Sequence, residues 1–127
     1  MKKLVFVYNG DSGLANGVMH YLHKRISPDT YPCELCGMVY DGMTLKKEWL
    51  DFVKSLGVPT EFLHRDEYRK AYGKSSHAWP AVLLHDDNKM LQVVLNAQDF
   101  KQIESLDVLQ EKLRAFVARE IPAGSAA

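Results

Sequence analysis

Short apolar runs alternate along the chain with longer stretches in which apolar residues return every three or four positions. The run Leu-Val-Phe-Val-Tyr at residues 4–8 is continuously apolar, which is typical of a strand covered on both faces. Apolar residues at helical spacing over residues 14–26 predict an amphipathic helix. Between the two, residues 9–13 read Asn-Gly-Asp-Ser-Gly, a turn in which Asp11 or Ser12 can cap that helix.

The middle of the chain predicts a mixture of strands and helices. Residues 31–40 are apolar and aromatic, and we expect a strand, a loop or both there. A second amphipathic helix is expected from a Thr44 cap to Leu56, and Gly57 ends it. The remaining elements of this part are a strand and a short helix, over residues 58–63 and 66–72.

The last third of the chain has the clearest pattern. Two apolar runs at residues 80–85 and 90–95 are separated by the polar turn Asp-Asp-Asn-Lys, which predicts a β-hairpin. A final helix follows, with Ser105 near its start and apolar residues on one face from Leu106 to Val117. This order of elements predicts an α/β fold with a central mixed sheet of about four strands flanked by helices.

Composition places the chain among globular domains and excludes several classes of function. Its 127 residues include 16 Lys and Arg against 16 Asp and Glu, so the formal net charge is zero. A phosphate backbone would meet no excess of positive charge, and we therefore expect no nucleic-acid partner. The apolar runs are too short to span a membrane. Hydrophobic residues make up 46% of the chain, too many for a disordered protein.

The length of the chain suits one domain, which we place at residues 1–121. The tail at residues 122–127 has almost nothing to bury and is expected to be flexible. The apolar run that follows Lys2 and Lys3 ends at Asn9, which is too short for an export signal. We therefore expect a cytoplasmic protein without membrane attachment.

The two cysteines of the chain, Cys33 and Cys36, form one Cys-x-x-Cys motif. This spacing lets both sulfurs reach one partner, whether each other or a metal ion. Redox chemistry needs an accessible thiol that ionises readily, and the neighbouring Glu34 opposes a negative sulfur. Three interpretations follow: thiol–disulfide chemistry, metal binding, or a structural pair of small buried side chains.

A metal site would need ligands beyond the two cysteines. A closed zinc site has four ligands, and thioether sulfurs favour Cu(I). None of the other candidate ligands stands at a diagnostic spacing; they are His64, His77, His85, Met38 and Met43.

The tripeptide His64-Arg65-Asp66 copies the catalytic tripeptide of protein kinases. The chain has neither the glycine-rich loop nor the other motifs of that family. We therefore expect Asp66 to cap the short helix that follows.

The order of the expected elements resembles the thioredoxin fold over about residues 2–120. In that fold a cis-proline precedes a strand of the final hairpin, and Ala-Trp-Pro-Ala-Val-Leu-Leu at residues 78–84 looks like that entry. The resemblance therefore implies a cis peptide bond between Trp79 and Pro80. The chain is also similar to small uncharacterised bacterial proteins with a Tyr-Pro-Cys-x-x-Cys element, here at residues 31–36.

One departure from the thioredoxin pattern concerns the cysteines. The family carries its Cys-x-x-Cys motif between the first strand and the next helix, whose N-terminus favours the thiolate. In this chain that junction, residues 9–13, contains no sulfur, and Cys33 and Cys36 come one helix later. The chain is thus an atypical member, in which only Pro80 can be carried over from the family.

These observations lead to the hypothesis of a small cytoplasmic thioredoxin-like protein with thiol–disulfide redox activity. Cys33 and Cys36 would be its catalytic pair, with Cys33 attacking and Cys36 resolving the mixed disulfide. Ser12, Trp79 and Pro80 are expected to shape the neighbouring groove, where Trp79 can offer a flat contact surface. The expected partner is a protein thiol or a small thiol, and we expect no cofactor.

Two alternatives belong to other functional classes. The first is a non-catalytic protein that binds zinc or copper through the same cysteines and a histidine. The second is a protein-binding module that keeps the fold without redox chemistry, in which the sulfurs are buried and reduced. The sequence leaves the oligomeric state open.

Overall fold

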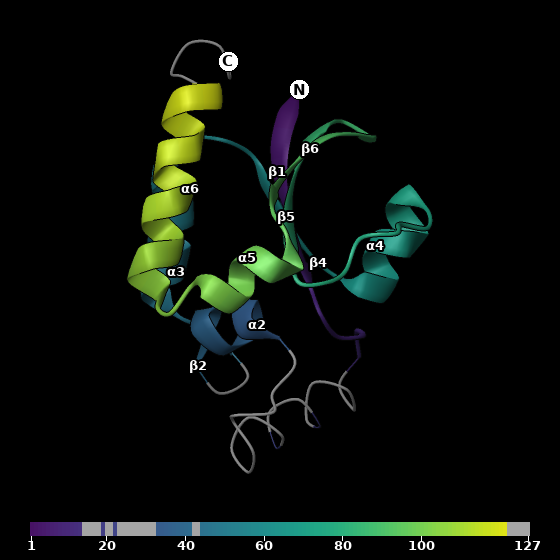
Figure 1. Cartoon of the computed structure of the whole chain (residues 1–127), viewed down its shortest axis with the longest axis horizontal. Helices are drawn as coiled ribbons and strands as arrows, with labels where there is room; N and C mark the ends of the chain where they lie inside the picture. Colours follow the sequence, from purple (N-terminus) through teal and green to yellow (C-terminus); the bar gives the residue numbers. More distant parts are fainter. Residues whose placement is uncertain (14–18, 20–21, 23–32, 42–43, 122–127) are drawn as a thin grey trace.

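The computed structural model of the chain describes residues 1–13, 19, 22, 33–41 and 44–121 (Figure 1). The helix predicted over residues 14–26 therefore lies largely outside the described residues, and the predicted flexible tail at residues 122–127 lies wholly outside them.

A four-stranded mixed sheet forms the centre of the fold. Its order is β4-β1-β5-β6, with β1 (Lys2–Tyr8), β4 (Thr60–His64), β5 (Ala81–Asp86) and β6 (Lys89–Leu95). β1 pairs in parallel with β4 and antiparallel with β5, and β5 and β6 form the predicted hairpin. The α/β fold class with a central mixed sheet is confirmed.

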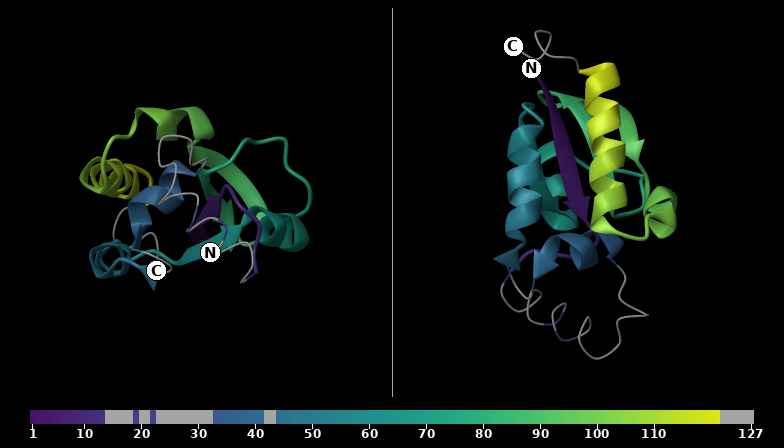
Figure 2. Two further views of the ribbon diagram at one scale, coloured as in Figure 1. Left: turned by 90° about the horizontal axis from the view of Figure 1, so that it is seen from below. Right: turned by 90° about the vertical axis from the view of Figure 1, so that its left-hand side faces the viewer.

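Helices flank both faces of this sheet (Figures 1 and 2). The helices α3 and α6 cover one face, α4 covers the other, and α2 lies at the end of the sheet where β1 finishes. The five described helices are α2 (Glu34–Val39), α3 (Lys47–Ser55), α4 (Arg65–Tyr72), α5 (Ala97–Gln102) and α6 (Leu106–Glu120). A separate short ribbon joins β2 (Tyr40–Asp41) to β3 (Thr44–Leu45).

The larger core lies between the sheet and the helices α3 and α6. Leu4 and Phe6 point to this side from β1, and the ring of Trp49 meets Phe6 edge-on at a centroid distance of 5.5 Å. Leu109 and Leu113 close the core from α6 and are fully buried. Burying each side chain of this size contributes about 1.5–3 kcal/mol, so this cluster holds the layers together.

The smaller core lies between the sheet and α4. Val5, Val7 and Leu83 fill it from the strands, and Tyr68 covers them from α4. Because β1 contributes to both cores, its sequence is continuously apolar rather than alternating. His85 is buried on this side, and its Nε2 lies 3.0 Å from the hydroxyl oxygen of Tyr68.

Local structure differs from the prediction in several places. The helix α2 begins at Glu34, where a strand or loop was expected, because six residues are too few to reveal a helical period. Thr44 does not cap α3: it pairs in β3, and α3 starts only at Lys47. The unpredicted helix α5 begins at a reciprocal capping pair formed by Asn96 and Asp99.

Three segments of the chain meet at the carboxyl end of β1. Tyr8 pairs with His64, the last residue of β4, so α4 begins beside the turn that follows β1. On the other side, Val7 pairs with Ala81, which brings Pro80 to the same end of the sheet. The peptide bond before Pro80 is cis, as the resemblance to the thioredoxin fold implied.

Candidate functional site

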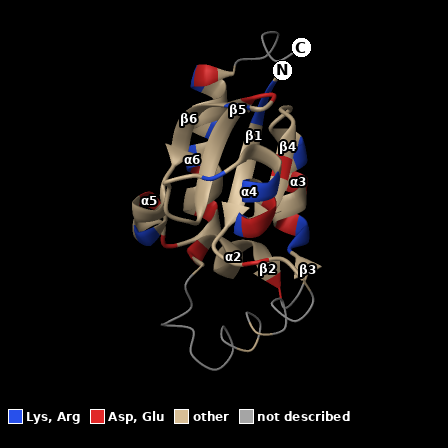
Figure 3. Ribbon diagram, turned by 90° about the vertical axis from the view of Figure 1, so that its right-hand side faces the viewer, with Lys and Arg blue, Asp and Glu red and all other residues tan. Residues whose placement is uncertain are grey.

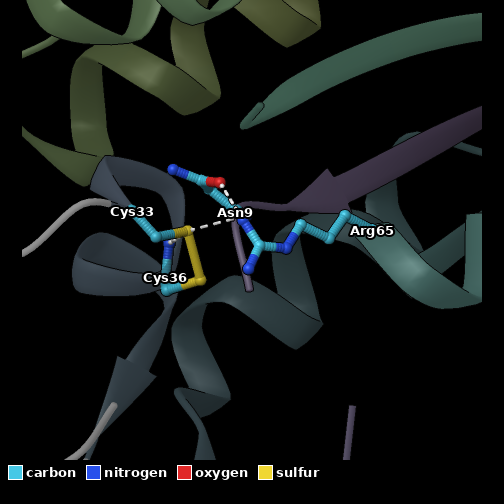
Figure 4. Close-up of a disulfide and its surroundings, with 4 residues drawn as sticks. All are labelled: Asn9, Cys33, Cys36 and Arg65. Atoms are coloured by element: carbon cyan, nitrogen blue, oxygen red, sulfur yellow. Dashed lines mark hydrogen bonds between the residues drawn. A yellow bond between two sulfur atoms is a disulfide. The ribbon is translucent and has the colours of Figure 1, made fainter. Parts of the chain in front are cut away.

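The two cysteines are joined in a disulfide at the start of α2, with their Cα atoms 5.3 Å apart (Figure 4). Cys33 occupies the N-cap position of α2, and Cys36 lies in its first turn. Residues three apart on a helical turn lie on the same side, so the motif and this short helix together bring the sulfurs into contact. The predicted pair therefore lies at bonding distance, which is compatible with redox chemistry.

The Sγ atom of Cys33 accepts two hydrogen bonds from the backbone. The N–H of Cys36 donates across 3.2 Å, and the N–H of Asn9 donates across 3.4 Å. Asn9 directly follows β1, so the disulfide lies beside the strand–turn junction although it comes one predicted helix later in the sequence. Two N–H donors aimed at one sulfur stabilise negative charge on it when the disulfide opens.

The two sulfurs differ in their access to solvent. Cys33 is 0% exposed and Cys36 is 8% exposed, and both belong to the larger core. Both cysteines are thus buried; Cys36 alone keeps some exposure to solvent, whereas Cys33 contacts the end of β1 through the N–H of Asn9.

Arg65 ties the first residue of α4 to the turn after β1. Its Nη1 donates to Oδ1 of Asn9 across 3.3 Å, and its backbone N–H donates to the carbonyl oxygen of Gly10. Its Nε and Nη2 both reach the carboxylate of Asp11, at 2.9 and 3.3 Å. The hydrogen bond from Arg65 holds the pKa of Asp11 below its ordinary value. Figure 4 shows Arg65 reaching toward Asn9 beside the disulfide.

Asp66 makes the second tie to the same turn. Its Oδ1 accepts the backbone N–H of Ser12 at 2.8 Å, and its Oδ2 accepts the Ser12 hydroxyl at 2.6 Å. The hydroxyl hydrogen bond is the largest cause that lowers the pKa of Asp66. The N-cap of α4 is His64, so the expectation that Asp66 is the cap was wrong by two positions. The Arg65-Asp66 pair, seen in the sequence only as part of a kinase-like tripeptide, fixes residues 9–12.

A groove of about 480 Å³ lies on the α4 side of this turn. Trp79, half-buried, lines it. Ser12 and Pro80 do not line the groove: Ser12 donates to Asp66, which does line it, and Pro80 is buried. The lining residues are Asp11, Arg65, Asp66, Tyr68, Arg69, Gly73, Lys74, Ser75 and Trp79.

Sequence reasoning did not single out Asn9, Arg69 or Lys74. Asn9 gave no signal for its contact with Cys33, because that contact is made by its backbone N–H rather than by its side chain. Arg69 and Lys74 look like ordinary solvated charges, and only the cis-proline loop beside them makes them part of a groove.

The candidate metal ligands are spread over the fold. His64 Nδ1 lies 2.8 Å from a carboxylate oxygen of Glu67, and His85 is buried under α4 next to Tyr68. Met38 packs against the larger core, and Met43 lies outside the described residues. Within the described ranges no three His, Cys, Asp or Glu side chains gather closely enough to hold a metal ion.

Comparisons with known proteins add no identification. No protein-family model, no curated protein and no solved structure matches the chain. Among the residues that the structure describes, no helix has both the length and the apolar character needed to cross a membrane. What can be said about function therefore rests on the fold and on the disulfide.

Proposed function

We propose that this protein is a small thioredoxin-like thiol–disulfide exchange protein, working in the cytoplasm as a single domain over residues 1–121. Cys33 and Cys36 are its redox pair, and its partner is a protein thiol or a small thiol. The observation that carries the proposal is the disulfide at the carboxyl end of β1, whose Cys33 sulfur accepts two backbone N–H bonds. Those bonds favour cleavage that leaves the electron pair on Cys33.

The difference in exposure supports an order of events opposite to the one expected from the sequence. A partner thiolate attacks Sγ of Cys36, the less buried cysteine, and a new disulfide forms between the partner and Cys36. The Cys33–Cys36 bond breaks, and its electron pair leaves with Cys33 as a thiolate held by the N–H of Asn9. In the reverse direction the Cys33 thiolate attacks Cys36 in the mixed disulfide and expels the partner thiolate.

Reaction with a soluble aromatic disulfide tests the proposal. The reduced full-length protein is mixed with this probe, and release of the coloured aromatic thiolate is followed over time. We expect the wild type to release two thiolates per chain and to end with its own disulfide formed. Cys33→Ser should stop at a stable mixed disulfide on Cys36, because the resolving sulfur is gone.

The thiol-free double variant Cys33→Ser/Cys36→Ser is the matched blank, since the chain has two cysteines. A protein whose disulfide stays closed in strongly reducing glutathione buffer would instead have a purely structural bond. The proposal would also be wrong if the double variant released as much aromatic thiolate as the wild type.

A further inference from the structure

The charges that line the α4 groove are unevenly satisfied. Asp11 is paired with Arg65, and Asp66 accepts both hydrogen bonds from Ser12. Arg69 and Lys74 also line the groove, and both are exposed. Within the part of the chain that the structure describes, these two cations form no ion pair. Arg69 also lies close enough to Asp11 to help lower the pKa of that carboxylate. The groove therefore carries three cations, Arg65, Arg69 and Lys74, against two carboxylates that are already engaged.

An aromatic surface lies beside these charges. The ring of Trp79 rests against Tyr68 at a centroid distance of 5.3 Å and stays half-buried. Tyr68 itself is 5% exposed, so it fixes the indole from below while one side of Trp79 lines the groove. Half-buried tryptophans held in this way are frequent anchors in protein interfaces. Figure 3 shows α4 from this side, with basic and acidic residues along it.

The groove is next to the disulfide. Asp11 lines the groove, and Asn9, two residues earlier, donates its backbone N–H to Cys33. Arg65 touches both, since it binds the side chains of Asn9 and Asp11. A chain segment that lies in the groove therefore passes one short turn away from the redox pair.

We propose that this groove binds an acidic peptide segment of the partner protein. Arg69 and Lys74 pair with its carboxylates, and Trp79 packs against an apolar side chain within it. The open shape and polar lining fit an extended peptide better than a small ligand, which needs an enclosed, largely apolar pocket. That the bound segment flanks a reactive cysteine rests on the proposed function; the binding itself does not.

Binding of sulfur-free peptides tests this inference separately from the redox chemistry. The probe is a short fluorescein-labelled peptide of Asp and Glu residues around one Phe and one Ser, and its counterpart carries Lys at the acidic positions. Fluorescence anisotropy measures Kd with the oxidised full-length protein. We expect the acidic peptide to bind at least about tenfold more tightly than the basic one, with affinity falling as salt is added.

Charge reversal identifies the groove as the binding surface. Arg69→Glu/Lys74→Glu should weaken binding of the acidic peptide by at least about tenfold, because two attractions become repulsions. Lys54→Glu/Lys112→Glu is the matched control: both lysines are exposed, lie outside the groove, and give the same change in net charge. Trp79→Ala should also weaken binding, and Cys33→Ser/Cys36→Ser should not.

Three results would overturn the inference. One is equal affinity for the acidic and basic peptides, and another is equal loss of affinity in the groove variant and the control variant. The third is displacement of the peptide by citrate beyond the effect of sodium chloride at equal ionic strength, which would assign the groove to small organic anions. Loss of redox activity without loss of peptide binding would leave this inference intact and remove only the proposed function.

Discussion

The backbone N–H of Asn9 donates to the Sγ of Cys33 across 24 positions of sequence. This contact joins the end of the central strand to the disulfide, and it is made by a main-chain group that any residue except proline would supply. The disulfide is thereby fixed against the sheet rather than carried on a free loop. Its chemistry depends on which of the two sulfurs a reagent can reach.

Alkylation of single-cysteine variants measures that access. In Cys33→Ser the remaining Cys36 should react with iodoacetamide at least roughly tenfold faster than the remaining Cys33 does in Cys36→Ser. The reason is burial: Cys33 is 0% exposed and Cys36 is 8% exposed. Rates in urea provide the reference, because both thiols should react alike in the unfolded chain. Faster reaction of Cys33 in the folded protein would reverse the order of attack proposed above.

The Asp66 carboxylate holds the turn that contacts the disulfide. Removing this carboxylate should therefore lower the free energy of unfolding. Asp66→Ala loses the hydrogen bonds from the N–H and hydroxyl of Ser12, and we expect the free energy of unfolding to fall by about 1–2 kcal/mol. Urea denaturation of the oxidised protein measures this. Asp51→Ala is the control, since its ion pair with Lys47 is exposed and is worth at most about 0.5 kcal/mol. Similar losses in both variants would mean that the Ser12 contact is not stabilising.

Trp49 should be the most sensitive position of the larger core. Its side chain is fully buried among Phe6, Phe52 and Phe62, so Trp49→Ala should lower the free energy of unfolding by about 3–5 kcal/mol. Trp49→Phe should cost much less, because the indole Nε1 has no hydrogen-bond partner among the described residues. Trp79→Ala, which removes a half-buried ring, serves as the comparison in the same urea titrations. An Ala variant as stable as the Phe variant would contradict this account of the packing.

His85 should make the protein less stable as the solution becomes acidic. Burial lowers the pKa of His85 from its ordinary value of 6.5, so the unfolded chain binds a proton more readily than the folded one. Stability is therefore full above that value and falls as pH drops through it, by up to about 1.4 kcal/mol per pH unit. The hydroxyl of Tyr68 and the ring of Tyr72 face the imidazole. After burial, which is the largest cause, the backbone of Asp87 and the charge of Glu61 act to raise the pKa of His85, and Lys3 acts to lower it.

Urea denaturation between about pH 7.5 and about pH 5.5 tests this behaviour. His85→Gln should flatten the dependence of the free energy of unfolding on pH in that range, whatever its effect on absolute stability. His77→Gln, at a half-exposed loop position, should leave the slope as it is in the wild type. An unchanged slope in His85→Gln would show that another group is responsible.

Much of the fold could be predicted because the apolar pattern of each strand indicates which of its faces are buried. β1 is buried on both faces and reads as a continuous apolar run, and the β5–β6 hairpin shows two such runs around a polar turn. The turn itself is shorter than predicted, since Asp86 pairs with Lys89 and only two residues remain outside the strands. The final helix matched its predicted face, and Ser105, expected near its start, is its N-cap.

The candidate site was only partly accessible to such reasoning. The spacing of Cys33 and Cys36 identified the pair, because three-residue separation is a local property. Their position against Asn9 is a long-range contact, which no local pattern encodes. The same holds for the ties between residues 11–12 and residues 65–66, each made over 54 positions of sequence. A short motif identifies the reactive side chains, whereas the residues that contact them are brought together by the fold.

The central place of β1 in the sheet also affects how the protein is made. β1 leaves the ribosome long before its two neighbours, since Leu4 pairs with Thr60 on one side and with Leu84 on the other. The nascent chain therefore carries an apolar strand with open edges until most of the domain has been synthesised. The β5–β6 hairpin, by contrast, can pair as soon as it emerges. The sheet can assemble only after β4 and β5 have been synthesised. Until then, β1 is the strand that needs shielding from aggregation.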